Sequence, residues 1–421
     1  MTGAAIAVPA HRTVARGGVR RERHEPAYAL LLAVMALTAF GIVMVYSASS
    51  VRSYFSTSDP ARQGLEQLVW AAIGLAGLFV ASRTDFRHLR YLAIPAFVIT
   101  LGLLVAVLVP GIGSEINGSR RWIVISGFGS LQPAEFAKLA VVLYLAHWLD
   151  RRGKAAGSFW NGLVPFSLLV APGFVLIAME PDLGTAAVYV AAAASVFFMA
   201  GANLFYIGAI TAGVIGAAWW MVSTTAYQME RIQTFLNPFS DPLGAGYNTM
   251  QSLMALALGG ITGLGLGESR QKFLYLPAPS TDFIFAIIGE EWGLVGTLAV
   301  VALFVVIAYQ GYRIAISAPD TFSGLLACGL TTWILVQALI NMMVVTALMP
   351  VTGIPLPFIS AGGSALTLNL AAIGILLSIS RETTETGSLR DALFGFGRRD
   401  RRARVPRAGR GPGAPKRPAR R

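Results

Sequence analysis

Asp282 is the side chain of this sequence best suited to acid–base chemistry. It opens an apolar stretch, Pro279 to Phe285, and it follows a loop that carries Arg270 and Lys272. A carboxylate beside apolar aromatic side chains has its pKa raised by desolvation, as a general base requires. The alternative is that Asp282 only caps a helix, although the Ser or Thr before it can also do so. The sequence favours a catalytic role.

Two more pairs of charged residues interrupt apolar stretches. Glu135 and Lys138 are three residues apart and can meet on one helix face, which fits a structural ion pair as well as a ligand site. Glu290 and Glu291 lie within the stretch that Asp282 opens. An ionised group at membrane depth costs about 3 kcal/mol or more, so these side chains are expected to face a bundle interior or a cavity.

A tight turn and a glycine pair complete the candidate polar sites. Glu180 and Asp182 flank a proline, and Asp182 either caps the helix that follows or belongs to a site. Gly362 and Gly363 follow the proline-rich run that ends at Ser360, where exposed backbone N–H groups can hold an anion.

The sequence lacks the motifs of several other enzyme classes. The four histidines are scattered, and neither an HExxH motif nor paired cysteines occur, which argues against a zinc hydrolase. No GxSxG or GxxxxGK[ST] motif is present, so neither a serine-hydrolase triad nor a nucleotide-binding P-loop is expected. Neither a nucleotide nor an organic cofactor is therefore predicted. The single cysteine, Cys328, permits no intrachain disulfide.

The composition indicates what must position these side chains. Of 421 residues, 55% are hydrophobic and only 13% are charged, and the mean hydropathy is +0.63. These values exclude a disordered chain and disfavour a soluble enzyme, which would expose too much apolar surface. A spanning helix needs about 20 mostly apolar residues. The candidate spans are 27 to 47, 65 to 82, 89 to 109, 135 to 150, 162 to 179, 184 to 200, 203 to 223, 282 to 309, 323 to 347 and 362 to 380.

The predicted fold is therefore an all-α polytopic membrane protein with about ten transmembrane helices. A large extracytoplasmic loop, 224 to 281, joins helices 7 and 8, and its apolar segment at 252 to 264 fits a re-entrant or interfacial helix. A second long outer connection covers 110 to 134. The predicted divisions are a basic tail at 1–26, a membrane domain at 27–380 and an Arg/Pro/Gly-rich tail at 381–421, which is expected to be disordered.

The net charge of +12 belongs to the two tails. Residues 1–26 contribute +3 and residues 381–421 contribute +9, whereas 27–380 are neutral. Basic residues in short flanking segments favour the cytoplasm, and ten spans put both termini on the same side. Both termini are thus predicted to be cytoplasmic, and no nucleic-acid partner is expected. Asp282 then falls on the outer side.

Five motifs occur in the order of one known family. They are Gly118 to Ile123, Gln132 to Lys138, Glu180 to Thr185, Ser280 to Glu291, and Pro350 to Ser364. In this combination the chain resembles the SEDS family (shape, elongation, division and sporulation) over essentially all ten spans. The run from Ser269 to Pro277 is similar to the division branch of that family more than to its elongation branch.

The resemblance implies a peptidoglycan glycosyltransferase that polymerises lipid II at the outer face of the bacterial cytoplasmic membrane. It also implies a class B penicillin-binding protein transpeptidase and other divisome proteins as partners, at the division septum. The family's catalytic aspartate falls on Asp282, which would take the acceptor hydroxyl proton in an inverting displacement. Glu135 and Lys138 match a pair of residues that the family carries in its fourth span.

The leaving lipid pyrophosphate needs positive partners, for which the available outer cations are Arg120, Arg121, Arg270 and Lys272. A divalent cation (Mg or Mn, with Asp282 as a possible ligand) is a further candidate partner. The substrate-binding residues expected from the motifs are Arg120, Arg121, Glu135, Lys138, Asp182, Arg270, Lys272, Ser360, Gly362 and Gly363.

The sequence departs from the family pattern at two positions. It also leaves two rival functions open. Ser280 stands where members commonly have His, and Ala361 stands where they have Tyr, which puts in doubt any proton relay or sugar contact from those side chains. A lipid II flippase would suit the intramembrane charges. A divisome scaffold with Asp282 as a helix cap is the third reading.

Overall fold

The fold was analysed in a computed structural model of the chain. It describes residues 27–116, 119–125, 129–224 and 226–382. The predicted tail at 1–26 and nearly all of the tail at 381–421 lie outside the described residues.

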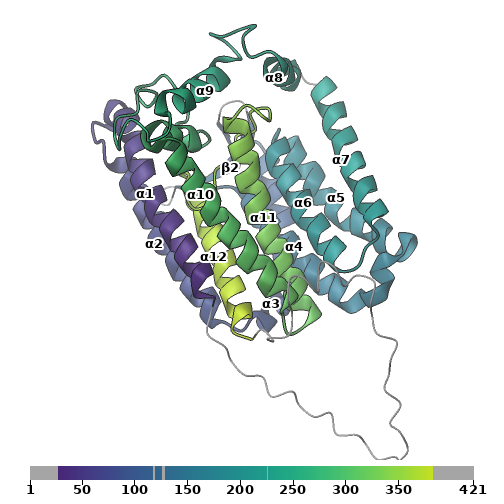
Figure 1. The fold of residues 1–421 in the computed structure, drawn as a ribbon. Helices are drawn as coiled ribbons and strands as arrows, with labels where there is room; N and C mark the ends of the chain where they lie inside the picture. Colours follow the sequence, from purple (N-terminus) through teal and green to yellow (C-terminus); the bar gives the residue numbers. More distant parts are fainter. Residues whose placement is uncertain (1–26, 117–118, 126–128, 225, 383–421) are drawn as a thin grey trace, which may run out of the picture.

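The described chain is mostly helical, which confirms the predicted fold class (Figure 1). The long helices are α1 (Tyr28–Thr57), α2 (Arg62–Arg83), α3 (Leu89–Leu108), α4 (Pro133–Arg152), α5 (Val164–Met179), α6 (Leu183–Met199), α7 (Leu204–Thr224), α8 (Ala226–Leu236), α9 (Tyr247–Gly259), α10 (Ile284–Ile316), α11 (Thr321–Val345) and α12 (Gly363–Ser380). Short helical turns are η1 (Phe86–His88), η2 (Gly153–Gly157) and η3 (Phe159–Leu163). The strands are β1 (Ser114–Ile116), β2 (Ser119–Ile125) and β3 (Gly129–Leu131).

Each of the ten predicted spans coincides with one of the helices α1 to α7 and α10 to α12. Within the described residues, eight helical stretches are long and apolar enough to cross a membrane, namely α1, α2, η1 with α3, η3 with α5, α7, α10, α11 and α12. Helix α6 is apolar but shorter, and α4 carries the buried pair Glu135 and Lys138 and a charged end. The chain is a multi-pass membrane protein, and ten crossings remain a prediction.

Small residues let the inner helices approach closely. A Cβ at Gly74 of α2 would lie 2.5 Å from the Leu370 side chain of α12, and one at Gly374 would lie 2.5 Å from the carbonyl of Leu78. Such contacts let helix backbones pack tightly where lipid supplies no hydrophobic driving force. Helix α7, in contrast, lies at the edge of the bundle with Val222 as its only buried residue (Figure 1).

The two ends of the described chain meet at one end of the bundle, where Ala27 N–H donates to Ser380 Oγ at 3.3 Å. This proximity requires an even number of crossings between them. We call this end, which also carries Arg87 and Arg90, the basic end.

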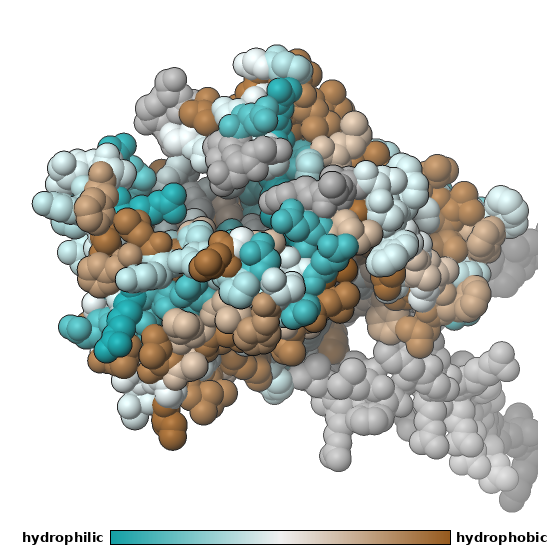
Figure 2. Space-filling model, turned by 90° about the horizontal axis from the view of Figure 1, so that it is seen from above, coloured by the Kyte–Doolittle hydropathy of each residue, from teal (hydrophilic) through white to brown (hydrophobic). Residues whose placement is uncertain are grey.

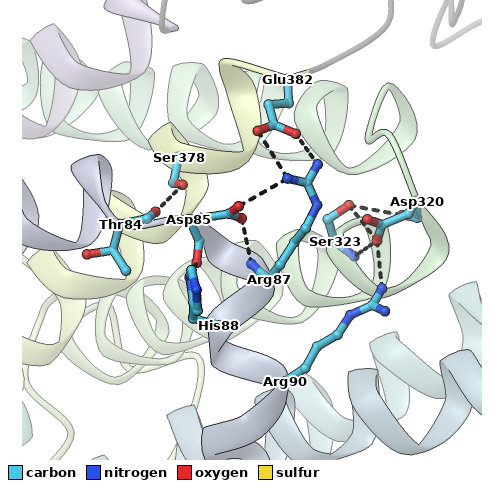
Figure 3. A network of polar contacts seen from close by, with 9 residues as sticks. All are labelled: Thr84, Asp85, Arg87, His88, Arg90, Asp320, Ser323, Ser378 and Glu382. Atoms are coloured by element: carbon cyan, nitrogen blue, oxygen red, sulfur yellow. Dashed lines mark hydrogen bonds and ion pairs between the residues drawn. The ribbon is translucent and has the colours of Figure 1, made fainter. Parts of the chain in front are cut away.

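Ion pairs tie several helix ends together at the basic end (Figure 3). Arg87 pairs with Asp85 and with Glu382, which follows α12. Arg90 at the start of α3 lies 3.3 Å from Asp150 of α4 and 3.2 Å from Asp320 before α11. The connection after α2 is thereby bound to three other elements.

The opposite end, which we call the loop end, carries the long connections. Figure 2 looks down on it and shows hydrophilic residues gathered on this face, with hydrophobic residues around the rim. Residues 114–131 include a three-stranded antiparallel sheet in the order β1-β2-β3, with Ile123 opposite Leu131. The all-α prediction missed this small sheet, although the β-branched run Ile123 to Ile125 favours a strand.

The large loop contains α8 and α9, and α9 occupies 247–259 instead of the expected 252–264. It ends early because Gly260 and Gly263 have φ of 55° and 82°, in the left-handed region that glycine tolerates. The chain then pairs with α10, where Leu264 N–H donates to Glu290 O at 3.0 Å and Leu294 N–H donates to Gly260 O at 2.9 Å. These bonds are possible because Gly293, with φ 64°, breaks α10.

Candidate active site

The turn that carries Asp282 is held by groups from two neighbouring elements. Asn341 Nδ2 of α11 donates to the carbonyls of Asp282 and Ile354, both at 2.8 Å. Ser360 Oγ donates to Thr281 O at 2.6 Å. Hydrogen bonds on both sides fix the backbone of this turn, so the Asp282 side chain projects from a positioned support.

Asp282 does not cap α10. The helix begins after Phe283, which makes no side-chain capping hydrogen bond. The Asp282 carboxylate instead lies beside Gly353, where a Cβ would be 3.7 Å from its Oδ2 and 4.0 Å from Arg121 Nη1. The lack of a side chain at Gly353 therefore leaves room beside both the carboxylate and the guanidinium.

The surroundings of Asp282 raise the pKa of its carboxyl group. Burial raises its pKa from 3.8 to about 6, and the negative charge of Asp182 acts in the same direction. The positive charges of Arg121 and Arg231 oppose this rise. Asp282 is consequently ionised at pH 7, yet it is a much stronger base than an exposed aspartate.

Arg121 reaches the site from β2. Its Nε donates to Glu180 O at 2.9 Å, its Nη2 donates to Pro181 O, and its Nη1 lies 3.6 Å from Asp182 Oδ2. The other Asp182 oxygen accepts from Thr185 N–H at 3.0 Å and caps α6. Asp182 therefore both caps a helix and orients the guanidinium.

Glu180 is a buried acid that the sequence analysis did not assign to the site. Both of its carboxyl oxygens are without a hydrogen-bond partner among the described residues. Burial, and then the charge of Asp182, raises its pKa to about 9, so it carries a proton at pH 7. The turn at Glu180 and Asp182 thus presents one neutral acid and one carboxylate.

Glu135 and Lys138 form the predicted pair in α4. Lys138 Nζ lies 2.6 Å from Glu135 Oε1 and 2.7 Å from Gln337 Oε1, and all of this is buried. Gln337 Nε2 in turn donates to Pro355 O at 3.0 Å. The pair therefore supports the segment after α11, and among the described residues it forms no hydrogen bond or ion pair with Asp282. Gln337 and Asn341 were missed, although amides one turn apart in an apolar helix are a signal for such a role.

Lys272 lies in a different buried cluster. Its ammonium donates to Ser47 Oγ at 3.4 Å and to Glu291 Oε1 at 3.5 Å, and it also contacts Gly267 O. Glu290 accepts from Ser269 Oγ and from Arg270 N–H, the latter at 2.9 Å. The two glutamates therefore pin the end of the large loop to the bundle.

Of the four cations expected around the leaving group, the structure brings Arg121 to Asp282. Arg120 is paired with Glu115 at 3.2 Å. Arg270 is exposed, and Lys272 is engaged as described. Arg231 of α8, which the sequence analysis did not select, supplies a second positive charge that acts on Asp282.

The glycine pair and the two departures from the family pattern lie behind the Asp282 turn. A Cβ at Gly363 would be 2.3 Å from the Trp70 ring, and Gly362 is the residue before α12. Ser280 Oγ accepts from Gln63 Nε2 at 3.1 Å, and Ala361 N–H donates to Ser280 O at 2.8 Å. In this structure these residues have packing and backbone roles, and anion binding at the glycines stays a prediction.

A metal ion would need help from the substrate at this site. The described residues contain no group of three or more His, Cys, Asp and Glu side chains that could hold one. Mg²⁺ is often bound through one or two carboxylates together with substrate phosphates, and Asp282 offers one such carboxylate.

The site as a whole combines a base of raised pKa, Asp282, with the guanidinium groups of Arg121 and Arg231. This combination suits proton removal from a hydroxyl near an anionic leaving group.

Comparisons with known proteins agree with this fold. A family model described as cell cycle protein, covering FtsW, RodA and SpoVE, matches residues 28–385. Stage V sporulation protein E of Bacillus subtilis is 43% identical over 362 residues, which covers 86% of this chain and 98% of the relative. A probable peptidoglycan glycosyltransferase FtsW of Trichlorobacter lovleyi is 41% identical over 83% of this chain and 92% of its own.

Solved structures resemble the fold as well. A chain of a peptidoglycan synthase complex, described as coordinating polymerization and crosslinking, has 30% identity and a TM-score of 0.69 over 85% of this chain and 98% of that chain. The rod shape determining protein RodA of Thermus thermophilus has 29% identity and a TM-score of 0.63, over 86% and 98% respectively. The chain therefore belongs to the SEDS family of cell cycle proteins, the family of FtsW, RodA and SpoVE.

Proposed function

We propose that this protein is a peptidoglycan glycosyltransferase that polymerises lipid II at the outer face of the cytoplasmic membrane. The observation that carries the proposal is Asp282, a base with raised pKa beside Arg121 at the loop end of the bundle. The relatives named as probable peptidoglycan glycosyltransferases support the same activity. The site lies at the end of the bundle opposite Ala27 and Ser380, which is the outer side in the proposed topology, where an exported substrate would be found.

The chemistry is an inverting displacement. Asp282 removes the proton from the acceptor sugar hydroxyl as its oxygen attacks the anomeric carbon of the donor. The bond from that carbon to the lipid pyrophosphate breaks, and the electron pair leaves with the phosphate oxygen. Arg121 stabilises the growing negative charge. The proton on Asp282 is then released to solvent, and the glycan is one unit longer.

A divalent cation, Mg or Mn, is part of the proposal. It would be held by the substrate phosphates with Asp282 as the available carboxylate, and it would neutralise pyrophosphate charge. The residues proposed to bind the lipid substrate are the ten expected from the sequence motifs. Arg121 and Asp182, which lie 3.6 Å apart, are the members of this set beside the Asp282 turn.

The proposed partners are a class B penicillin-binding protein transpeptidase and other divisome proteins. The solved peptidoglycan synthase complex, in which polymerization is coordinated with crosslinking, supports a transpeptidase partner. Both termini are proposed to be cytoplasmic and the protein to act at the division septum. The similarity to the B. subtilis sporulation protein makes a sporulation septum the alternative location.

The proposal is tested by purifying the protein with a candidate transpeptidase, adding lipid II and a divalent cation, and resolving glycan chains on a gel. Asp282→Asn should abolish polymerisation while still binding the partner. Asp59→Asn, which changes an exposed aspartate in the turn between α1 and α2, is the matched control and should polymerise normally. Full activity of Asp282→Asn would refute the catalytic assignment. Loss of chains in every variant would favour a flippase or a scaffold.

A further inference from the structure

A cavity of about 200 Å³ opens at the loop end beside the Asp282 turn. Its wall is formed by α8, by the start of α9 with the residues before it, and by the segment that follows α11. Charged and polar side chains line it, namely Glu230, Arg231, Thr234 and Asn248, with an apolar side that includes Phe235 and Pro350.

The cavity is connected to the base by two features. Val351 lines the cavity and lies two residues before Gly353, which adjoins the Asp282 carboxylate. Arg231 also lines the cavity, and its positive charge acts on Asp282. Arg121, the cation proposed to meet the leaving group, adjoins Gly353 and is not part of the cavity wall. The base therefore has a cationic partner in β2 and a separate polar cavity beside it.

The lining suits one sugar ring. Sugar hydroxyls both donate and accept hydrogen bonds, and the carboxylate, guanidinium, amide and hydroxyl groups of the wall together offer both functions. The apolar side chains can cover a ring face. The volume of about 200 Å³ leaves room for a single sugar ring.

We propose that this cavity binds the acceptor sugar, the ring whose hydroxyl attacks, and that Thr234 and Asn248 are specificity residues for it. The inference rests on the proposed glycosyltransferase function. A ring seated here adjoins the segment that runs from Val351 to Gly353, against which the Asp282 carboxylate lies, while the donor pyrophosphate is placed toward Arg121. The two substrates thereby approach Asp282 from different elements.

The test separates the acceptor from the donor. A labelled lipid-linked tetrasaccharide that lacks its own attacking hydroxyl can only donate, and lipid II at varied concentration serves as acceptor. The labelled hexasaccharide product is then measured. Thr234→Val and Asn248→Ala should each raise the KM for lipid II about tenfold, because each removes a hydrogen bond to the bound ring. The KM for the donor should stay within about twofold.

Two more variants make the result decisive. Gln233→Ala changes an exposed neighbour on α8 that does not line the cavity, and it should alter neither KM. Ala245→Leu, which fills the cavity from its wall, should raise the KM for lipid II without the loss of a polar group. Each variant is first shown to keep its melting temperature and partner binding.

A raised KM for the donor, or unchanged KM values in the Thr234, Asn248 and Ala245 variants, would overturn the acceptor assignment. Failure of the proposed function itself looks different, because the unaltered protein then forms no hexasaccharide, or Asp282→Asn forms as much as the unaltered protein.

Discussion

The pH dependence of polymerisation tests the Asp282 environment directly. If Asp282 is the general base, the acidic limb of kcat/KM reports its ionisation in the free enzyme. With a pKa of about 6, about one tenth of the base is ionised at pH 5, and the rate should fall about tenfold for each further pH unit. An aspartate with the ordinary pKa of 3.8 would be about nine tenths ionised at pH 5, so its rate would barely change there.

Asp182→Asn supplies the structural control for this prediction. Asparagine still caps α6, but the negative charge that helps to raise the Asp282 pKa is gone. The acidic midpoint should therefore move below pH 6, toward the ordinary value. Burial is the largest cause of the raised Glu180 pKa of about 9, so Glu180 titrates well above the acidic limb.

The assay is the initial rate of chain formation from labelled lipid II between pH 4.5 and 8. Samples held at the lowest pH are returned to pH 7.5 and must regain the full rate, which excludes unfolding as the cause. Asp59→Asn should show the unaltered midpoint. A midpoint near pH 4 in the unaltered protein, or an unchanged midpoint in Asp182→Asn, would refute the reasoning.

Three further changes are read from melting temperatures in detergent. Gly293→Ala should lower the free energy of unfolding by about 2 kcal/mol or more, because φ at this residue is 64° and the new Cβ would lie 2.4 Å from a backbone nitrogen. An unchanged melting temperature would show that α10 is not kinked at this residue. Lys138→Met should cost about 3 kcal/mol by leaving Glu135 buried and unpaired, and adding Glu135→Gln should recover most of it. Arg90→Ala should cost about 1 kcal/mol, whereas Arg62→Ala, from an exposed pair, should cost nothing measurable; equal effects would contradict the argument.

The helices could be predicted from the sequence because their signal is local. Apolar runs of about 20 residues appear wherever the chain crosses the bundle, and the spacing of Glu135 and Lys138 predicts contact on one helix face. The capping role of Asp182 could be predicted for the same reason, since the group that it binds is three residues away. Each of these features depends on residues that are close together in the sequence.

The surroundings of the base could not be predicted in the same way. Lys272 precedes Asp282 by ten residues, and the loop charge suggested that it serves the leaving group, yet its ammonium lies on Glu291 and on Ser47, 225 residues away. Arg231 is fifty-one residues before Asp282 and acts on it because α8 lies beside the segment after α11. Long-range contacts of this kind follow from packing, and no spacing rule encodes them.

The buried charges also bear on whether this bundle acts as a transporter or as a polymerase. A transporter places ionisable groups at its midplane so that they can bind a cargo in one state and release it in another. Here Lys138 is engaged by Glu135 and Gln337, and Glu291 is engaged by Ser47 and Lys272. Breaking either set would leave an uncompensated buried charge, which costs about 3 to 5 kcal/mol. Their geometry therefore favours fixed structural contacts, which hold the segment after α11 and the large loop in place, and a rigid support of this kind suits a polymerase more than a carrier.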